Sequence, residues 1–236
     1  MKRAPPGWPT LDLMTEGDVV EGPLQAGSPL RTPRAAALAG IVFSVFLITA
    51  LVLLRLSVPA NPRTAGTWLT DSGRRTAASV GLNLIPFAGI AFLWFVGVLR
   101  DRIGEREDRF FATVFLGSGL LFVAMLFVAA AAAGGIFTEA SRPSGPPGPD
   151  TLGLGRDVST LLLNVYSMRM AAVFTLTTVT IARHTKIVSR WLTVAGIVTA
   201  LVLLVGVGLS PWVELLFPAW ILALSIDILV ASRRAT

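Results

Sequence analysis

Six long apolar stretches make up almost the whole chain after residue 34, and they constrain the fold more than any other feature. Each lies at or near the ~20 residues that a helix needs to cross ~30 Å of hydrocarbon. We therefore expect an all-α polytopic membrane protein, folded as a bundle of six transmembrane helices. The expected helices are 35–56, 77–99, 110–134, 158–182, 188–208 and 212–231.

The composition agrees with a lipid environment. Hydrophobic residues make up 53% of the chain and charged residues 14%, and the mean hydropathy is +0.71. A water-soluble protein of this composition would have more apolar surface than it could bury. The formal net charge of +6 needs no nucleic-acid partner, because the basic residues are spread over several joints between the apolar stretches. The expected partner is the lipid bilayer.

The placement of lysine and arginine predicts which side of the membrane each joint faces, because basic joints stay in the cytoplasm. With the N-terminus inside, thirteen basic residues fall on inner joints and five on outer joints. The inner ones are Lys2, Arg3, Arg31, Arg34, Arg100, Arg102, Arg106, Arg109, Arg183, Lys186, Arg190, Arg233 and Arg234. The outer ones are Arg63, Arg74, Arg75, Arg142 and Arg156. This bias predicts that both termini are cytoplasmic.

Residues 1–34 are expected to form a disordered cytoplasmic tail ahead of a transmembrane domain at 35–236. The first ten residues hold three prolines where a secretory signal would need an apolar segment, so the helix 35–56 is expected to be an uncleaved anchor. Arginine far outnumbers lysine, and alanine, glycine and proline are frequent. This bias suggests a GC-rich bacterial gene, and the bacterial cell (cytoplasmic) membrane is therefore the expected location.

Two joints on the outer side carry helix-boundary signals. Asp71 and Ser72 are suited to cap a helix that begins outside the membrane. The joint from Ile136 to Asp157 is rich in proline and glycine, so it is expected to be an irregular loop, with Asp157 as the cap of the helix that follows.

Small residues recur at four-residue spacing, which lets neighbouring helices approach closely. They are Ala36, Gly40 and Ser44; Gly117, Ser118, Gly119, Ala130 and Gly134; and Gly196 and Ala200. They fit contacts inside the bundle or, as a weaker alternative, a homodimer. The first interpretation is favoured, because any six-helix bundle needs such contacts.

Arg169 is the most costly residue to place in a membrane. It lies about eleven residues inside the helix 158–182, near the bilayer midplane. A charge at that depth needs a partner or water. Its expected partners are Asn83, Tyr166 and Glu214.

A partly polar stripe runs along the helix 158–182 at spacings of three and four residues, and is expected to face the bundle interior. Its members are Tyr166, Arg169, Val173, Thr177 and Thr180. It is either a path for a solute or ion, or interhelical glue whose threonines bond their own backbone. Asp227, near the inner end of the last helix, is a second intramembrane charge, explained by snorkelling to a nearby arginine or by a proton relay.

The joint between the second and third helices contains Gly97, Asp101, Arg102, Gly104 and Arg106. This pattern is similar to the G-x-x-x-D-R-x-G-x-R signature of the major facilitator transporters, which also lies between helices two and three on the cytoplasmic side. Six helices with a cytoplasmic N-terminus and an arginine in the fourth also look like half of such a transporter. In that family the aspartate pairs with neighbouring helix ends and the glycines allow a tight turn.

The run LNLIPFAGIAFLWFVGVLRDRIGEREDRFFATVFLGSGLLF, within residues 82–126, resembles a group of uncharacterised actinobacterial multi-span membrane proteins. That resemblance supports the topology and implies no activity.

The sequence has few residues that could serve in catalysis or bind a metal. The chain has no cysteine and one histidine, and no nucleophile, carboxylate pair or phosphate-binding motif has the necessary spacing. No enzyme activity, cofactor or metal is expected. The chain is expected to be a structural or accessory component of a membrane assembly, with a membrane-protein partner or a second copy as its protein partner. The alternative is a small six-helix transporter with a path past Arg169.

Overall fold

The computed structural model describes residues 33–57, 71–103, 109–140, 148–185, 189–206, 210 and 212–234. Within these ranges the chain is helical and contains no strand. The helices are α1 (Pro33–Ser57), α3 (Ser72–Ile103), α4 (Arg109–Ala140), α5 (Pro149–Thr160), α6 (Met168–Thr185), α7 (Arg190–Val205) and α8 (Leu216–Arg234). A π-helical segment, η3 (Leu161–Ser167), joins α5 to α6 without a break, and a 3₁₀ turn, η4 (Val213–Leu215), leads into α8.

Five of the resulting rods are long and apolar enough to cross a membrane. They cover Arg34–Ser57, Ser72–Arg100, Phe110–Glu139, Asp150–Arg183 and Val213–Arg233. The sixth, α7, has 16 residues and is shorter than a full span needs. The expectation of an all-helical fold is therefore confirmed for the described residues, and five of the rods have the length and composition that a membrane span needs. Six crossings and the cytoplasmic location of both termini stay predictions.

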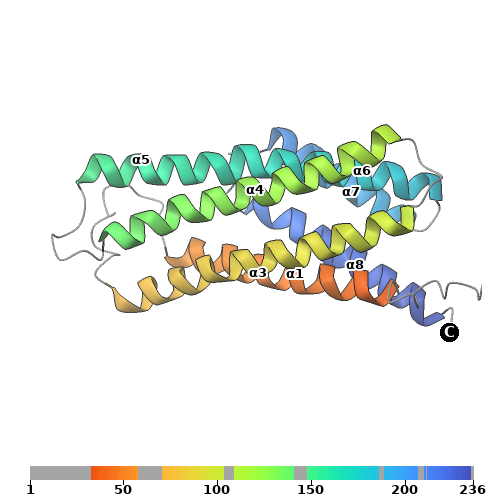
Figure 1. The fold of residues 1–236 in the computed structure, drawn as a ribbon, viewed down its shortest axis with the longest axis horizontal. Helices are drawn as coiled ribbons and strands as arrows, with labels where there is room; N and C mark the ends of the chain where they lie inside the picture. Colours follow the sequence, from red (N-terminus) through yellow and green to blue (C-terminus); the bar gives the residue numbers. More distant parts are fainter. Residues whose placement is uncertain are drawn as a thin grey trace, which may run out of the picture. The chain divides into compact units, whose positions relative to one another are not determined.

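The helices of residues 33–234 pack in chain order and close into a ring. α1 lies against α3, α3 against α4, α4 against the α5–η3–α6 rod, α6 against α7, α7 against α8, and α8 returns to α1 (Figure 1). We call the end at which α1 begins and α8 ends the near end of this bundle, and the opposite end the far end.

The core of the bundle is a cluster of phenylalanine rings, one from each of the five long rods. Phe92 lies 4.7 Å from Phe43, 5.1 Å from Phe122, 5.0 Å from Phe174 and 5.9 Å from Phe217, measured between ring centroids. All five side chains are fully buried. Edge-to-face and tilted contacts of this kind are favourable for aromatic rings. We call this set the phenylalanine cluster; its rings come from within α1, α3, α4 and α6 and from the start of α8.

Glycines allow close helix contacts at several places. A Cβ on Gly40 would collide with Ser225 Oγ of α8 and would lie 2.9 Å from the Phe95 ring of α3. A Cβ on Gly196 would lie 2.8 Å from Trp220 Nε1, whose N–H donates a hydrogen bond to the Leu192 carbonyl oxygen at 3.1 Å. At Gly40 and Gly196 the small residues thus serve contacts inside the bundle. Gly117 and Gly134 have open space where a Cβ would point.

Helix boundaries differ from expectation mainly at the far end. Within the joint 136–157, residues 141–147 lie outside the described residues. α4 continues to Ala140 and the next helix begins at Pro149, so the prediction of an irregular loop is wrong for these two parts of the joint. Pro149 is the reason, because proline is favoured at the first turn of a helix. Asp157 consequently lies inside α5 and caps nothing. The capping prediction for Asp71 is confirmed, since its Oδ1 accepts hydrogen bonds from the amides of Gly73 and Arg74.

Two further expectations meet the described ranges only in part. The tail 1–34 lies outside them except for its last two residues, which belong to α1. In the transporter-like signature, α3 runs through Gly97, Asp101 and Arg102, while Gly104 and Arg106 lie outside the described residues. Gly97 is therefore part of a continuous helix, not of a tight turn.

Candidate functional site

The clearest charged contact inside the bundle joins Arg55 and Glu214. Arg55 is in the last turn of α1 and Glu214 is in η4, and Arg55 Nη2 donates to Glu214 Oε1 at 2.7 Å. The Glu214 side chain is 7% exposed and that of Arg55 is 35% exposed. Both ends of the pair lie within segments that are long and apolar enough to be membrane spans. The pair is a fixed, partly buried link between α1 and α8 at the far end.

Sequence reasoning gave Glu214 the wrong partner. The sequence predicts Glu214 as one of three partners of Arg169 and assigns no partner to Arg55, whereas Glu214 pairs with Arg55. A signal for the observed pair exists in the chain order, because the end of the first apolar stretch and the head of the last one lie at the same end of an up-and-down bundle. Arg55 and Glu214 are the charged residues at those two places.

Arg169 is exposed, and so is Tyr166, at 52%. The expectation that both face the bundle interior is wrong. The Arg169 side chain makes no hydrogen bond or ion pair with any other described residue.

Helix geometry explains the displacement of the predicted stripe. At 3.6 residues per turn, Thr177 lies about 80° around the helix from Arg169, so a four-residue spacing drifts off a single face. Thr177 is accordingly buried while Arg169 and Leu176 are exposed. The threonine hydroxyls bond their own helix, since Thr177 donates to the Val173 carbonyl oxygen at 2.8 Å and Thr180 to that of Leu176 at 2.9 Å. This is the backbone bonding expected if the stripe serves helix packing and not transport.

Arg169 lies at the level of the phenylalanine cluster, on the other side of its helix. Ser167, two residues earlier, is buried and its hydroxyl lies 3.4 Å from the Phe122 carbonyl oxygen. Phe174, five residues later, contacts Phe92 and Phe217. At 1.5 Å of rise per residue, Arg169 therefore stands within about 8 Å of both levels. A charge near mid-depth costs at least ~2.5 to 3.5 kcal/mol on insertion scales.

The remaining predicted site residues do not join Arg169. Asn83 is exposed on α3, where its Nδ2 donates to the Ser79 carbonyl oxygen at 2.8 Å. Asp227 is half-buried on α8, and the described residues hold no ion pair to it. Thr177 is turned inward. The structure thus disperses the predicted polar site over separate faces of three helices.

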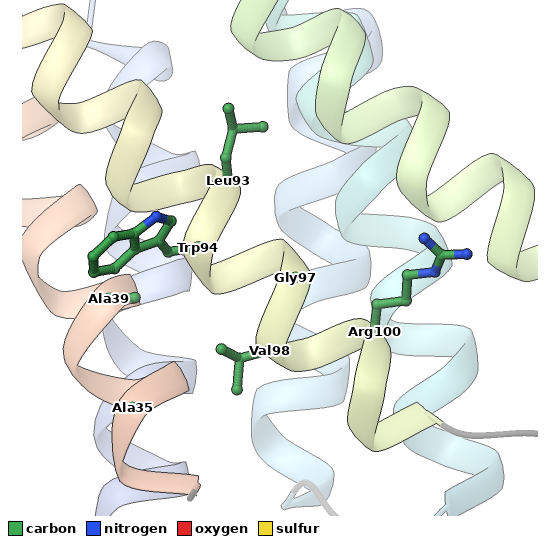
Figure 2. Close-up of a pocket in the computed structure, with 7 residues that line it drawn as sticks. All are labelled: Ala35, Ala39, Leu93, Trp94, Gly97, Val98 and Arg100. Carbon is green, nitrogen blue, oxygen red and sulfur yellow. The ribbon is translucent and has the colours of Figure 1, made fainter. Parts of the chain in front are cut away.

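A groove of about 470 Å³ lies between α1 and α3 toward the near end. Small residues, Ala35 and Ala39 on α1 and Gly97 on α3, form part of its wall, and Trp94 borders it. Figure 2 shows Arg100 directed to the opposite side of α3 from Trp94 and Val98. The groove therefore presents an apolar lining with one peripheral charge, which suits hydrocarbon better than a polar ligand.

Metal ligands do not gather within the described part of the chain, where no group of three or more His, Cys, Asp or Glu residues could hold an ion. Comparison with protein-family models, with curated proteins and with solved structures finds no match to this chain. The two resemblances seen in the sequence therefore stay predictions, and the arguments below rest on the chain's own residues.

Proposed function

We propose that this chain is a multi-pass protein of the bacterial cytoplasmic membrane that serves as a non-catalytic, accessory component of a membrane assembly, with both termini in the cytoplasm. The observation that carries the proposal is the phenylalanine cluster. Five rings from five helices occupy the interior of the bundle, where a transport protein would need a polar, water-accessible path.

The arrangement of polar groups supports the same choice. Buried hydroxyls at Ser44, Thr175 and Thr178 donate to carbonyl oxygens of their own helices, at 2.8, 2.8 and 2.7 Å. Such groups are already satisfied and offer little to a passing ion. The alternative, transport past Arg169, loses its support because Arg169 stands on the outer face of its helix. An outward charge instead favours association with another membrane component.

The orientation follows from the positive-inside rule. Arg34, Arg100, Arg183, Arg190 and Arg233 lie toward the near end, where α1 begins and α8 ends. Basic residues at one end favour its placement in the cytoplasm.

The test has two arms. Purification of the full chain from its native membrane in mild detergent is expected to yield a second protein in fixed stoichiometry. The purified chain alone, in sealed vesicles, is expected to leave the permeability to protons, potassium and small solutes at the level of empty vesicles. A monomer free of partners, or a flux that depends on Arg169, would overturn the proposal.

A further inference from the structure

We propose that the exposed face of the α5–η3–α6 rod around Tyr166 and Arg169 binds a transmembrane helix of a different protein, one that carries a carboxylate at mid-depth. This inference deepens the proposed function and rests on it. It names the surface on which an assembly would form and the chemistry of the partner that the surface selects.

The first step is the depth of the charge. Arg169 is 14 residues from Arg183 and 19 from Asp150, the two ends of the predicted span. These separations correspond to about 21 and 28 Å along the rod. An extended arginine side chain reaches about 7 Å. This rod is longer than the ~30 Å hydrocarbon core, so the depth is taken from the expected span 158–182, whose middle residue is 170. With Arg169 at the centre of a core that extends ~15 Å to either side, the guanidinium cannot reach a lipid phosphate.

The second step is the lack of a partner within the bundle. Arg169 points away from the phenylalanine cluster. Glu214, the carboxylate that the sequence predicts as its partner, is paired with Arg55 at 2.7 Å instead. In lipid, a cation is stabilised by pairing or by water. A lipid-facing guanidinium at mid-depth therefore calls for a carboxylate supplied from outside the chain.

The third step concerns a second copy of the chain as the occupant. In a symmetric dimer through this face, each Arg169 would need a carboxylate at its own level on the other copy. Asp227 is ten residues nearer the near end than Phe217, which belongs to the phenylalanine cluster. Its level is thus about 15 Å from that cluster. Asp157 lies 12 residues before Arg169, about 18 Å away in the opposite direction. Neither matches, so a different protein fits better.

The surroundings of Arg169 suit a packed helix. Val158, Leu161 and Leu176 are exposed on the same rod and extend the surface to either side of Tyr166 and Arg169. Apolar flanks with one central charge allow two helices to pack while a single ion pair sets their register. The π-helical segment η3 ends at Ser167, directly before this charge, and π-helical segments are frequent at functional sites.

The first experiment uses synthetic single-span Leu/Ala helices as the probe. One carries a central Glu, and matched helices carry Gln or Leu there, or the Glu moved seven residues toward one end. Association with the full chain in vesicles is followed by energy transfer from a dye on a cysteine at Ser232→Cys, the chain having no natural cysteine. The central Glu helix is expected to associate about fivefold more tightly than the Leu helix.

Arg169→Leu is expected to abolish this preference and Arg169→Lys to keep most of it. Because Arg169 is exposed and its side chain makes no hydrogen bond or ion pair with a described residue, Arg169→Leu is expected to insert and fold normally, which helix content by circular dichroism verifies. Equal binding of the Glu and Leu helices to the unaltered chain, or a preference that survives Arg169→Leu, overturns the proposal.

The second experiment places a photoreactive phenylalanine analogue at Tyr166 in the full chain in native membranes, with Val198 on α7, also exposed, as the control position. We expect a protein adduct from position 166 alone, lost in Arg169→Leu, with the crosslinked peptide lying in a transmembrane segment that holds Asp or Glu. An adduct with a second copy, or with lipid only, overturns the proposal. If a stoichiometric partner still co-purifies in that case, the proposed function stands and only this surface fails; if none does, both fail.

Discussion

Arg55 Nη2 lies 2.7 Å from Glu214 Oε1, which joins the end of α1 to the start of α8 across 159 residues of chain. The contact closes the ring of helices at the far end. Because Glu214 is nearly buried, its charge depends on this one cation for most of its stabilisation.

We expect Arg55→Leu to lower the free energy of unfolding by about 1 to 3 kcal/mol. This is below the 3 to 5 kcal/mol of fully buried pairs, because the Arg55 side chain is 35% exposed. Arg55→Leu is destabilising because Glu214 loses its partner while staying buried. Thermal unfolding in detergent, followed by circular dichroism, measures the loss. Arg55→Lys, which keeps the cation, is expected to cost less, and the Arg55→Leu/Glu214→Leu double variant is expected to recover most of the stability. A double variant as unstable as the single one contradicts this account.

Because α1 approaches its neighbours closely at Gly40, replacement by alanine is expected to change stability differently at Gly40 and at Gly117. Gly40→Ala is expected to destabilise by about 1 to 3 kcal/mol, because the new Cβ meets Ser225 Oγ and the Phe95 ring. Gly117→Ala has open space and is expected to be neutral or stabilising by up to ~1 kcal/mol, since alanine is the better helix former. Denaturation of the two variants under identical detergent conditions decides the matter. Equal effects would mean that α1 and α8 do not meet at Gly40.

The phenylalanine cluster predicts strong dependence on ring position along α3. Phe92→Ala is expected to cost about 3 kcal/mol or more, because it leaves a cavity among four other rings. Phe87→Ala is the control, since Phe87 lies on the same helix with its side chain exposed. Its loss is expected to change stability by less than about 1 kcal/mol. A Phe92→Ala variant as stable as Phe87→Ala would show that the rings do not pack as described.

The proposed orientation predicts which introduced cysteines react from outside the cell. Ser72→Cys at the far end is expected to react with a membrane-impermeant maleimide in intact cells, whereas Ser232→Cys at the near end is expected to react only after permeabilisation. The natural chain gives no background, as it contains no cysteine. The reverse pattern would refute the N-in arrangement, and labelling of both in intact cells would refute the membrane topology itself.

Much of the fold could be predicted from the sequence, with boundaries less accurate than elements. Each expected helix overlaps an observed one, because a long apolar run satisfies its backbone only by local hydrogen bonds. The joint 136–157 was misjudged because its composition is that of a loop while Pro149 occupies a position that starts a helix. The candidate site was predicted less well: Glu214 was recognised as an intramembrane charge but paired with the wrong arginine.

The sequence by itself determined that this chain forms long apolar helices, since length and composition suffice to select that structure. Tertiary structure decided which side of each helix faces inward. The polar residues of α6 do not fix its rotation, because threonine hydroxyls can bond their own helix and so fit either an inward or an outward face. Packing of rings from five different helices sets that rotation. It brings Arg55 to Glu214 and turns Tyr166 and Arg169 outward.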